Sequence, residues 1–205
     1  MDIQLNFVNQ SSDHNNSEIV IFQKNVADPT SETAVAWIVI KDCGPGWHHP
    51  FTYFLQNCVG AKDSLGNYSD LHIAENGQKW DVVLTTSGDQ VTLDASHGSS
   101  PEAITICNRL QGAIDGYIYK GGKLIAAKTN MQPGMEANFE LVPTIWLGVV
   151  AEMEEGSIMN PAIVKQLNTE ISLLGIAKAD IVMTGGGTGA GAKPFQFFLQ
   201  NVIMA

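Results

Sequence analysis

The segment YIYKGGKLIAAK (Tyr117–Lys128) decides the fold class. It consists of two strand-like runs that are separated only by Gly121 and Gly122. A two-residue connection between antiparallel strands requires a positive φ at both central positions, and glycine adopts that conformation without steric strain. The segment therefore predicts a tight β-hairpin.

The same strand-like pattern extends to both sides of the hairpin. Near the start of the chain, Ile3, Leu5 and Phe7 alternate with Gln4 and Asn6, which is typical of a half-buried strand. Turn signals then recur through the sequence, at Gly66-Asn67, Asn76-Gly77, Ser87-Gly88-Asp89 and Pro133-Gly134. About a dozen short strands at such spacing indicate a sandwich or barrel. We expect an all-β protein, an antiparallel β-sandwich of the jelly-roll or immunoglobulin-like kind.

Two further strands and one helix can be placed in more detail. AVAWIVI (34–40) is apolar on both faces and predicts a central strand, and in KPFQFFLQNVIM (193–204) one face receives Phe195, Phe197, Leu199, Asn201 and Ile203. A short helix is expected near 160–169, because Asn160 can cap it and Pro161 suits its first position. The later residues EISLLGI can instead form a strand. With no linker or break in composition, residues 1–205 are expected to form a single β-sandwich domain.

Composition excludes several classes of function. The 205 residues are 44% hydrophobic and 16% charged, with a net charge of −10 and a single arginine, Arg109. Nucleic acid and anionic membranes are therefore not expected as partners, whereas neutral glycans, neutral lipids, cations and further copies of the chain remain. No apolar run approaches the ~18 residues of a transmembrane segment. The first residues lack the pattern of a secretory signal. We therefore expect synthesis in the cytoplasm, with non-classical release as an option, and assign no compartment. The three cysteines have no metal-site spacing and are expected to be reduced.

The stretch KDCGPGWHHPFTYF (41–54) is the richest in candidate functional residues. Its Gly-Pro-Gly predicts a turn, and the following aromatic residues can form a platform for a sugar ring or a lipid interface. The ligand-binding candidates are Trp47, His48, His49, Phe51 and Tyr53. The alternative reading places the aromatic residues in the core, with the histidines in solvent. Adjacent residues of a strand point to opposite faces, so His48 and His49 do not easily share a metal ion. We assign no catalytic residue, metal ligand or cofactor.

The string MTGGGTGAGAKP (183–194) resembles the glycine loop of tubulin and its bacterial division homologue. In that family the loop opens a helix and holds a nucleotide phosphate. Here Pro194 and an alternating strand follow instead, so we expect a loop between two strands. DSLGNYSD (63–70) carries oxygen ligands but not the order of a calcium loop, and it is expected to be a polar loop.

The runs IVIFQKN, AVAWIVI, CGPGWHHPFTY and KPFQFFLQNVIM resemble a small, poorly characterised group of bacterial β-proteins of similar length. Some members of that group carry a ring-opening dioxygenase label, which the histidine geometry expected here does not support. The architecture is also similar in style to β-sandwich cytolysins and aegerolysin-like proteins, with no motif in common. Such proteins act on membranes without catalysis.

Three functional hypotheses follow from these observations. The leading one is a non-catalytic, toxin-like binding protein that recognises a cell-surface glycan or lipid through its loop aromatics and oligomerises. The second is a structural protein that assembles into filaments or inclusions through apolar strands at a sheet edge. The third is a metal-dependent enzyme that uses His48 or His49. We expect that the protein is not an enzyme.

Overall fold

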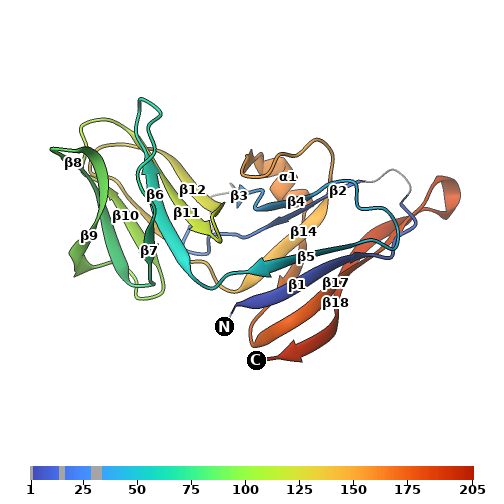
Figure 1. Ribbon diagram of the computed structural model, residues 1–205. Helices are drawn as coiled ribbons and strands as arrows, with labels where there is room; N and C mark the ends of the chain where they lie inside the picture. The colour runs from blue at the N-terminus through green and yellow to red at the C-terminus, as the bar shows by residue number, and fades with distance from the viewer. Residues whose placement is uncertain (1, 14–16, 29–33) are drawn as a thin grey trace. The chain divides into compact units, whose positions relative to one another are not determined.

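The computed structural model describes residues 2–13, 17–28 and 34–205 (Figure 1). It is 57% strand with one short α-helix among the described residues, and none of its sheets closes into a barrel. This confirms the all-β, sandwich-like fold. Internal contacts divide the chain into two compact units, which we describe separately: unit 1 comprises 1–23, 32–55 and 143–205, and unit 2 comprises 24–31 and 56–142. That all 205 residues form one domain stays a prediction.

Unit 1 contains two four-stranded sheets. In the first, the order is β18-β17-β1-β5, built from β1 (Ile3–Asn9), β5 (His48–Tyr53), β17 (Ile176–Gly186) and β18 (Lys193–Met204). In the second, the order is β16-β14-β2-β4, built from β2 (Glu18–Phe22), β4 (Ile38–Ile40), β14 (Thr144–Val150) and β16 (Thr169–Ser172). A two-stranded ribbon joins β3 (Ala34–Val35) to β15 (Ile158–Met159). Not every pairing is antiparallel, because β1 runs parallel to β17.

The core of unit 1 has apolar residues on both faces of the second sheet. Ile19 and Ile21 of β2 are fully buried on one face, and Val20 and Phe22 are fully buried on the other. The second of these faces packs with the helix and the ribbon, in a cluster formed by Val20, Phe22, Ala34, Ala36, Trp146, Met153, Met159, Val164 and Leu167. In the first sheet, Ile3, Leu5 and Phe7 are buried as predicted.

The helix α1 (Pro161–Gln166) begins as the sequence predicts. Asn160 caps it by accepting a hydrogen bond from the Ala162 N–H at 2.8 Å, and Pro161 occupies the first turn. The helix ends three residues before the expected position 169, because the β-branched Thr169 and Ile171 belong to β16. The ambiguity between helix and strand in EISLLGI is thus resolved toward a strand.

Two details of unit 1 differ from the sequence prediction. AVAWIVI does not form a central strand: it divides into β3 and β4, and β4 is at the edge of its sheet. Its apolar residues are nevertheless buried, since Trp37 lies between the two strands with its ring 5.6 Å from Tyr53. In β18, a bulge at Asn201, whose φ is 50°, shifts the register. Ile203 therefore lies opposite Lys178, on the other face from Phe195 and Leu199.

Unit 2 is built from two further four-stranded sheets. In one, the order is β12-β11-β6-β7, from β6 (Asn57–Lys62), β7 (His72–Ala74), β11 (Ile114–Lys120) and β12 (Lys123–Met131). In the other, the order is β13-β10-β8-β9, from β8 (Gln78–Thr85), β9 (Gly88–His97), β10 (Ile104–Asn108) and β13 (Glu136–Phe139). The predicted hairpin is confirmed: β11 and β12 pair through Lys120 and Lys123, with φ of 56° and 77° at Gly121 and Gly122.

The two sheets of unit 2 approach each other closely at Gly116. A Cβ added there would lie 3.3 Å from Cδ1 of Ile106 in the opposite sheet, and 3.1 Å from Sδ of Met131. Glycine at this position therefore sets the spacing between the two sheets.

The glycine-rich string of residues 183–194 joins β17 to β18, with a single 3₁₀ turn at Gly189–Gly191. A strand, and not a helix, follows it, as expected from Pro194 and the alternation after it. Across the described part of the chain, none of the helices is both long enough and apolar enough to span a membrane.

Candidate functional site

The loop that carries most of the predicted site residues forms the expected turn. The Trp47 N–H donates to the Gly44 carbonyl at 3.1 Å, and Gly46 has a φ of 82°. Proline at the second position and a positive φ at the third are the pattern of a type II turn. Trp47 follows this turn with 64% of its surface exposed. It is available to a ligand, although it lines none of the pockets described below.

The two histidines lie on opposite faces of β5. His48 is opposite Val8 and His49 is opposite Phe7, and both histidines are exposed. Nδ1 of His48 is 3.2 Å from Nδ2 of Asn6. Within residues 2–13, 17–28 and 34–205, no three His, Cys, Asp or Glu side chains converge in a way that could hold a metal ion. The hypothesis of a His48/His49 enzyme gains no support from this geometry.

The remaining two predicted residues are not equally accessible. Phe51 is half-buried, with its ring 6.2 Å from that of Trp37. Tyr53 is only 1% exposed and lies edge-on to Trp37, so the expectation that it belongs to a surface site is wrong. Burial raises the pKa of Tyr53 to about 12, although a hydrogen bond with Gln23 opposes the shift. Tyr53 is a core residue because its position in β5 faces the same side as Ile3.

A groove in unit 2 offers a better-formed site than this loop. It consists of two adjoining depressions of about 390 and 570 Å³. The loop between β6 and β7 forms one wall, and β9 with the β8–β9 turn forms the other. Both depressions are lined by Tyr68, Ser69, Ser87 and Asp89. These volumes are within the range of pockets that bind small molecules.

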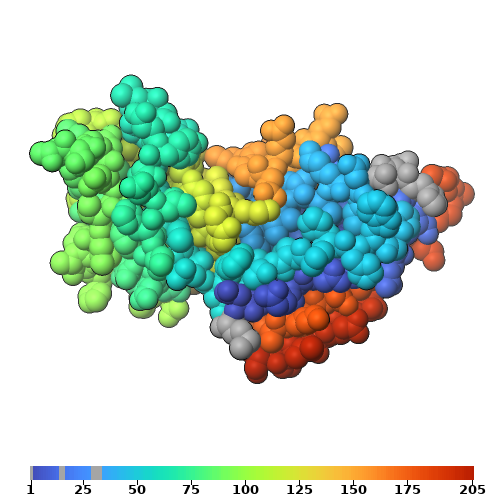
Figure 2. Space-filling view, viewed as in Figure 1, coloured from blue at the N-terminus to red at the C-terminus, as the bar shows by residue number. Residues whose placement is uncertain are grey.

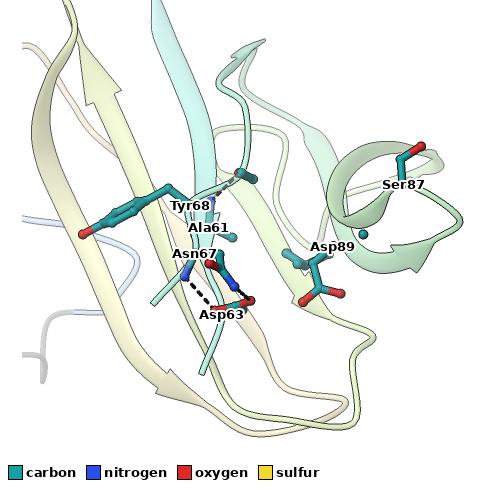
Figure 3. Close-up of a pocket in the computed structure, with 9 residues that line it drawn as sticks. Ala61, Asp63, Asn67, Tyr68, Ser87 and Asp89 are labelled. Atoms are coloured by element: carbon teal, nitrogen blue, oxygen red, sulfur yellow. Dashed lines mark hydrogen bonds between the residues drawn. The ribbon is translucent and has the colours of Figure 1, made fainter. Parts of the chain in front are cut away.

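The β6–β7 wall of the groove is held in shape by Asp63 (Figure 3). Its carboxylate accepts hydrogen bonds at 2.8 Å from the backbone N–H groups of Leu65 and Asn67 and from the Asn67 side chain. These bonds, that of the Asn67 side chain foremost, lower the pKa of Asp63. Asp63 is therefore engaged within its own loop, as expected of an Asx turn and not of a calcium ligand.

Aromatic side chains form the floor and one rim of the groove. Trp80, which is 6% exposed, stacks with His72 at a ring distance of 5.6 Å and an angle of 24°. Tyr68 is 67% exposed, and in Figure 3 its ring points away from Asp89. That ring stacks on Tyr117 at 6.1 Å. Burial, followed by the nearby Asp115 carboxylate, raises the pKa of Tyr117, so its hydroxyl stays neutral at physiological pH.

The polar groups of the groove include two carboxylates that are free to accept hydrogen bonds. The carboxylates of Asp70 and Asp89 have no hydrogen-bond or ion-pair partner within the described part of the chain. Ser69, Ser87, Gln90 and Thr92 add hydroxyl and amide groups. No lysine or arginine is among the described residues that line either depression. The groove thus combines aromatic surface with unpaired carboxylates, and His72 is the one basic side chain among its described lining residues.

The sequence indicates the two walls of this groove as separate loops, but it does not indicate that they lie side by side. It predicts residues 63–70 as a polar loop and Ser87-Gly88-Asp89 as a turn, but it does not single out Tyr68 or Trp80. The two walls are more than a dozen residues apart in the sequence, so only the pairing of strands brings them together. An exposed tyrosine between Asn67 and Ser69 is the one local signal that could have suggested a binding loop.

Comparisons of this chain with protein-family models, with curated proteins and with solved structures found no match. The resemblances described above therefore stay predictions.

Proposed function

We propose that the protein is a non-catalytic binding protein and that its groove in unit 2 takes a neutral oligosaccharide. One observation carries this proposal. The Asp70 and Asp89 carboxylates, which have no partner among the described residues, line the same depression as the stacked rings of His72 and Trp80. A sugar presents hydroxyl groups that donate to carboxylates and apolar C–H faces that pack on aromatic rings. The groove supplies both kinds of contact side by side.

Charge narrows the class of ligand further. The chain has a net charge of −10, and the described lining residues of the groove contribute Asp63, Asp70 and Asp89 without a lysine or arginine. An anionic ligand such as a phosphate or a sulfated glycan would be repelled. A neutral sugar avoids that repulsion, and its hydroxyl donors match the surplus of acceptors.

Binding to an array of neutral oligosaccharides, followed by calorimetric titration of the sugar that binds best, tests the proposal. We expect Asp70→Asn/Asp89→Asn to weaken that binding about tenfold or more, since hydrogen bonds to a charged acceptor are the strong ones. Glu102→Gln is the matched control, because Glu102 is an exposed carboxylate of unit 2 outside the groove. It should leave the affinity unchanged.

A second variant separates the groove from the loop of unit 1. Trp47→Ala removes the most exposed aromatic residue of that loop, and binding through the groove predicts no change in sugar affinity. If Trp47→Ala abolishes binding while the double aspartate variant retains it, the loop is the site and the groove proposal is wrong. If the protein binds phosphatidylcholine vesicles and none of the sugars, the ligand class is wrong.

A further inference from the structure

The outer strand β18 of unit 1 is an open sheet edge whose protecting features, Lys193, Pro194 and a bulge at Asn201, lie toward its two ends. It pairs with β17 along one side, and no described strand pairs with its other side. Residues 195–205 (FQFFLQNVIMA) contain no charged residue and no proline. Edge strands commonly carry lysine, proline or a bulge that prevents further pairing. In β18 a register shift between Lys193 and Gln196 and the bulge at Asn201 leave Gln196 to Gln200 as the regular segment.

The side chains of β18 are also incompletely covered. Phe195, Phe197 and Leu199 on the inner face are only half-buried, although Phe197 approaches Phe7 with a ring distance of 6.5 Å. On the opposite face Phe198 is 39% exposed. In Figure 2 this strand, coloured red, forms a continuous strip along one margin of unit 1. The edge therefore combines free backbone groups with exposed apolar surface.

We propose that a second copy of the chain binds this edge, with the two β18 strands antiparallel about a two-fold axis. The two sheets of order β18-β17-β1-β5 then join into one continuous eight-stranded sheet. The regular segment from Gln196 to Gln200 pairs, and the irregularities on its two sides mark where pairing ends.

The chemistry of the edge favours a strand over a lipid surface. Backbone N–H and C=O groups along a free edge need hydrogen-bond partners, and hydrocarbon chains supply none. The regular segment of this edge lacks charges, so nothing on that segment selects an oppositely charged foreign partner. Two copies that each carry a net charge of −10 can still meet here, because the contact itself is uncharged.

The strand is self-complementary in one register. With Phe197 of one copy opposite Phe197 of the other, Leu199 of each copy lies at the end of the partner's regular segment, toward Phe195. The half-buried inner-face residues of the two copies then form a single apolar row. On the outer face, Gln196 of one copy lies opposite Phe198 of the other.

Sedimentation velocity over a wide range of protein concentration tests this assembly. We expect a reversible dimer that salt strengthens, because screening weakens the repulsion between two acidic chains. Gln196→Lys/Phe198→Lys brings like charges together across the axis and should weaken dimerisation about tenfold or more. His48→Lys/Thr52→Lys is the matched control: it adds the same number of lysines to β5 at the other edge of the sheet and should leave the dimer intact.

Hydrogen exchange of the unmodified protein provides a readout that needs no variant. Backbone amides of 195–200 should gain protection on going from dilute to concentrated solution, whereas those of β5 should not. A chain that is monomeric at every concentration, with no change in exchange, would overturn the proposal. So would a dimer that both lysine pairs weaken equally, or a monomer that binds phosphatidylcholine vesicles through residues 195–205.

Discussion

The two units share a plan of paired four-stranded sheets, but they distribute apolar and polar groups differently. In unit 1 the sheet β16-β14-β2-β4 has buried apolar residues on both faces, and the few buried polar side chains of the unit include Gln23 and Thr144. In unit 2 the two sheets approach closely at Gly116, and the ion pairs Lys79–Glu136 and Arg109–Asp81 lie on the outer face. The core of unit 2 lies between its two sheets, and side chains at the edge of these sheets form the groove. The two proposals accordingly place assembly on unit 1 and recognition on unit 2.

The largest effect that tests this comparison is expected at Trp37. Its ring is 1% exposed and contacts Phe51 and Tyr53, so Trp37→Ala should lower the free energy of unfolding by about 3–5 kcal/mol. Hydrogen exchange measured on separate peptides should show that amides of unit 1 lose protection. Trp47→Ala, at an exposed position, should change stability little. Equal loss of protection in both units would show that they unfold as one body, and it would support the single-domain prediction.

A smaller effect is expected from Gly116→Ala in unit 2. The new methyl group would press on Ile106 and Met131, which predicts a loss of about 1–3 kcal/mol in the free energy of unfolding. Adding Ile106→Val removes the Cδ1 atom that lies 3.3 Å from the new group and should restore part of the stability. Denaturant titration of the two single variants and the double variant measures this coupling. If the two changes are simply additive, the spacing of the sheets is not set at Gly116.

The smallest predicted effect concerns pH and the outer face of unit 1. The Asp180 carboxylate accepts hydrogen bonds from the side-chain amides of Asn201 at 2.7 Å and Asn6 at 2.9 Å, and these bonds lower its pKa. A lowered pKa in the folded state adds stability above the pKa of the unfolded chain, and that stability is lost as the pH falls through the folded pKa. We expect this contribution to be about 1 kcal/mol or less.

Asp180→Asn should therefore reduce the difference in stability between neutral and acidic solution, as measured by denaturant titration at several pH values. Asp89→Asn in unit 2 is the control, because its carboxylate has no partner among the described residues. An identical response of both variants would mean that the Asn6–Asp180–Asn201 contacts contribute nothing measurable to unit 1.

Local features of this molecule could be predicted from its sequence, whereas features that depend on distant pairing could not. The Gly121-Gly122 hairpin, the Asn160 cap and the alternation of β1 follow from the chemistry of neighbouring residues. The edge position of β4 and the shift of Ile203 depend on which strands pair and on one bulge. Periodicity alone contains neither fact.

The same reason explains why the sequence points to the loop around Trp47 and not to the groove of unit 2. Trp47, His48 and His49 stand out because they are adjacent in the sequence, and Tyr53 was grouped with them although it faces the core. Asp70, Trp80 and Asp89 converge only after β6, β7, β8 and β9 have formed their sheets. The polar loop of residues 63–70 and the turn at Ser87-Gly88-Asp89 become a candidate site only because they line the same groove.

The order of strands in unit 1 has a consequence for how the chain folds as it leaves the ribosome. β1 lies between β5 and β17, so a strand made among the first ten residues waits for a neighbour made some 170 residues later. Unit 2 is complete once residue 142 has been synthesised, well before that neighbour exists. Until β17 exists, β1 has only β5 as a neighbour, and contacts of such long sequence separation form slowly.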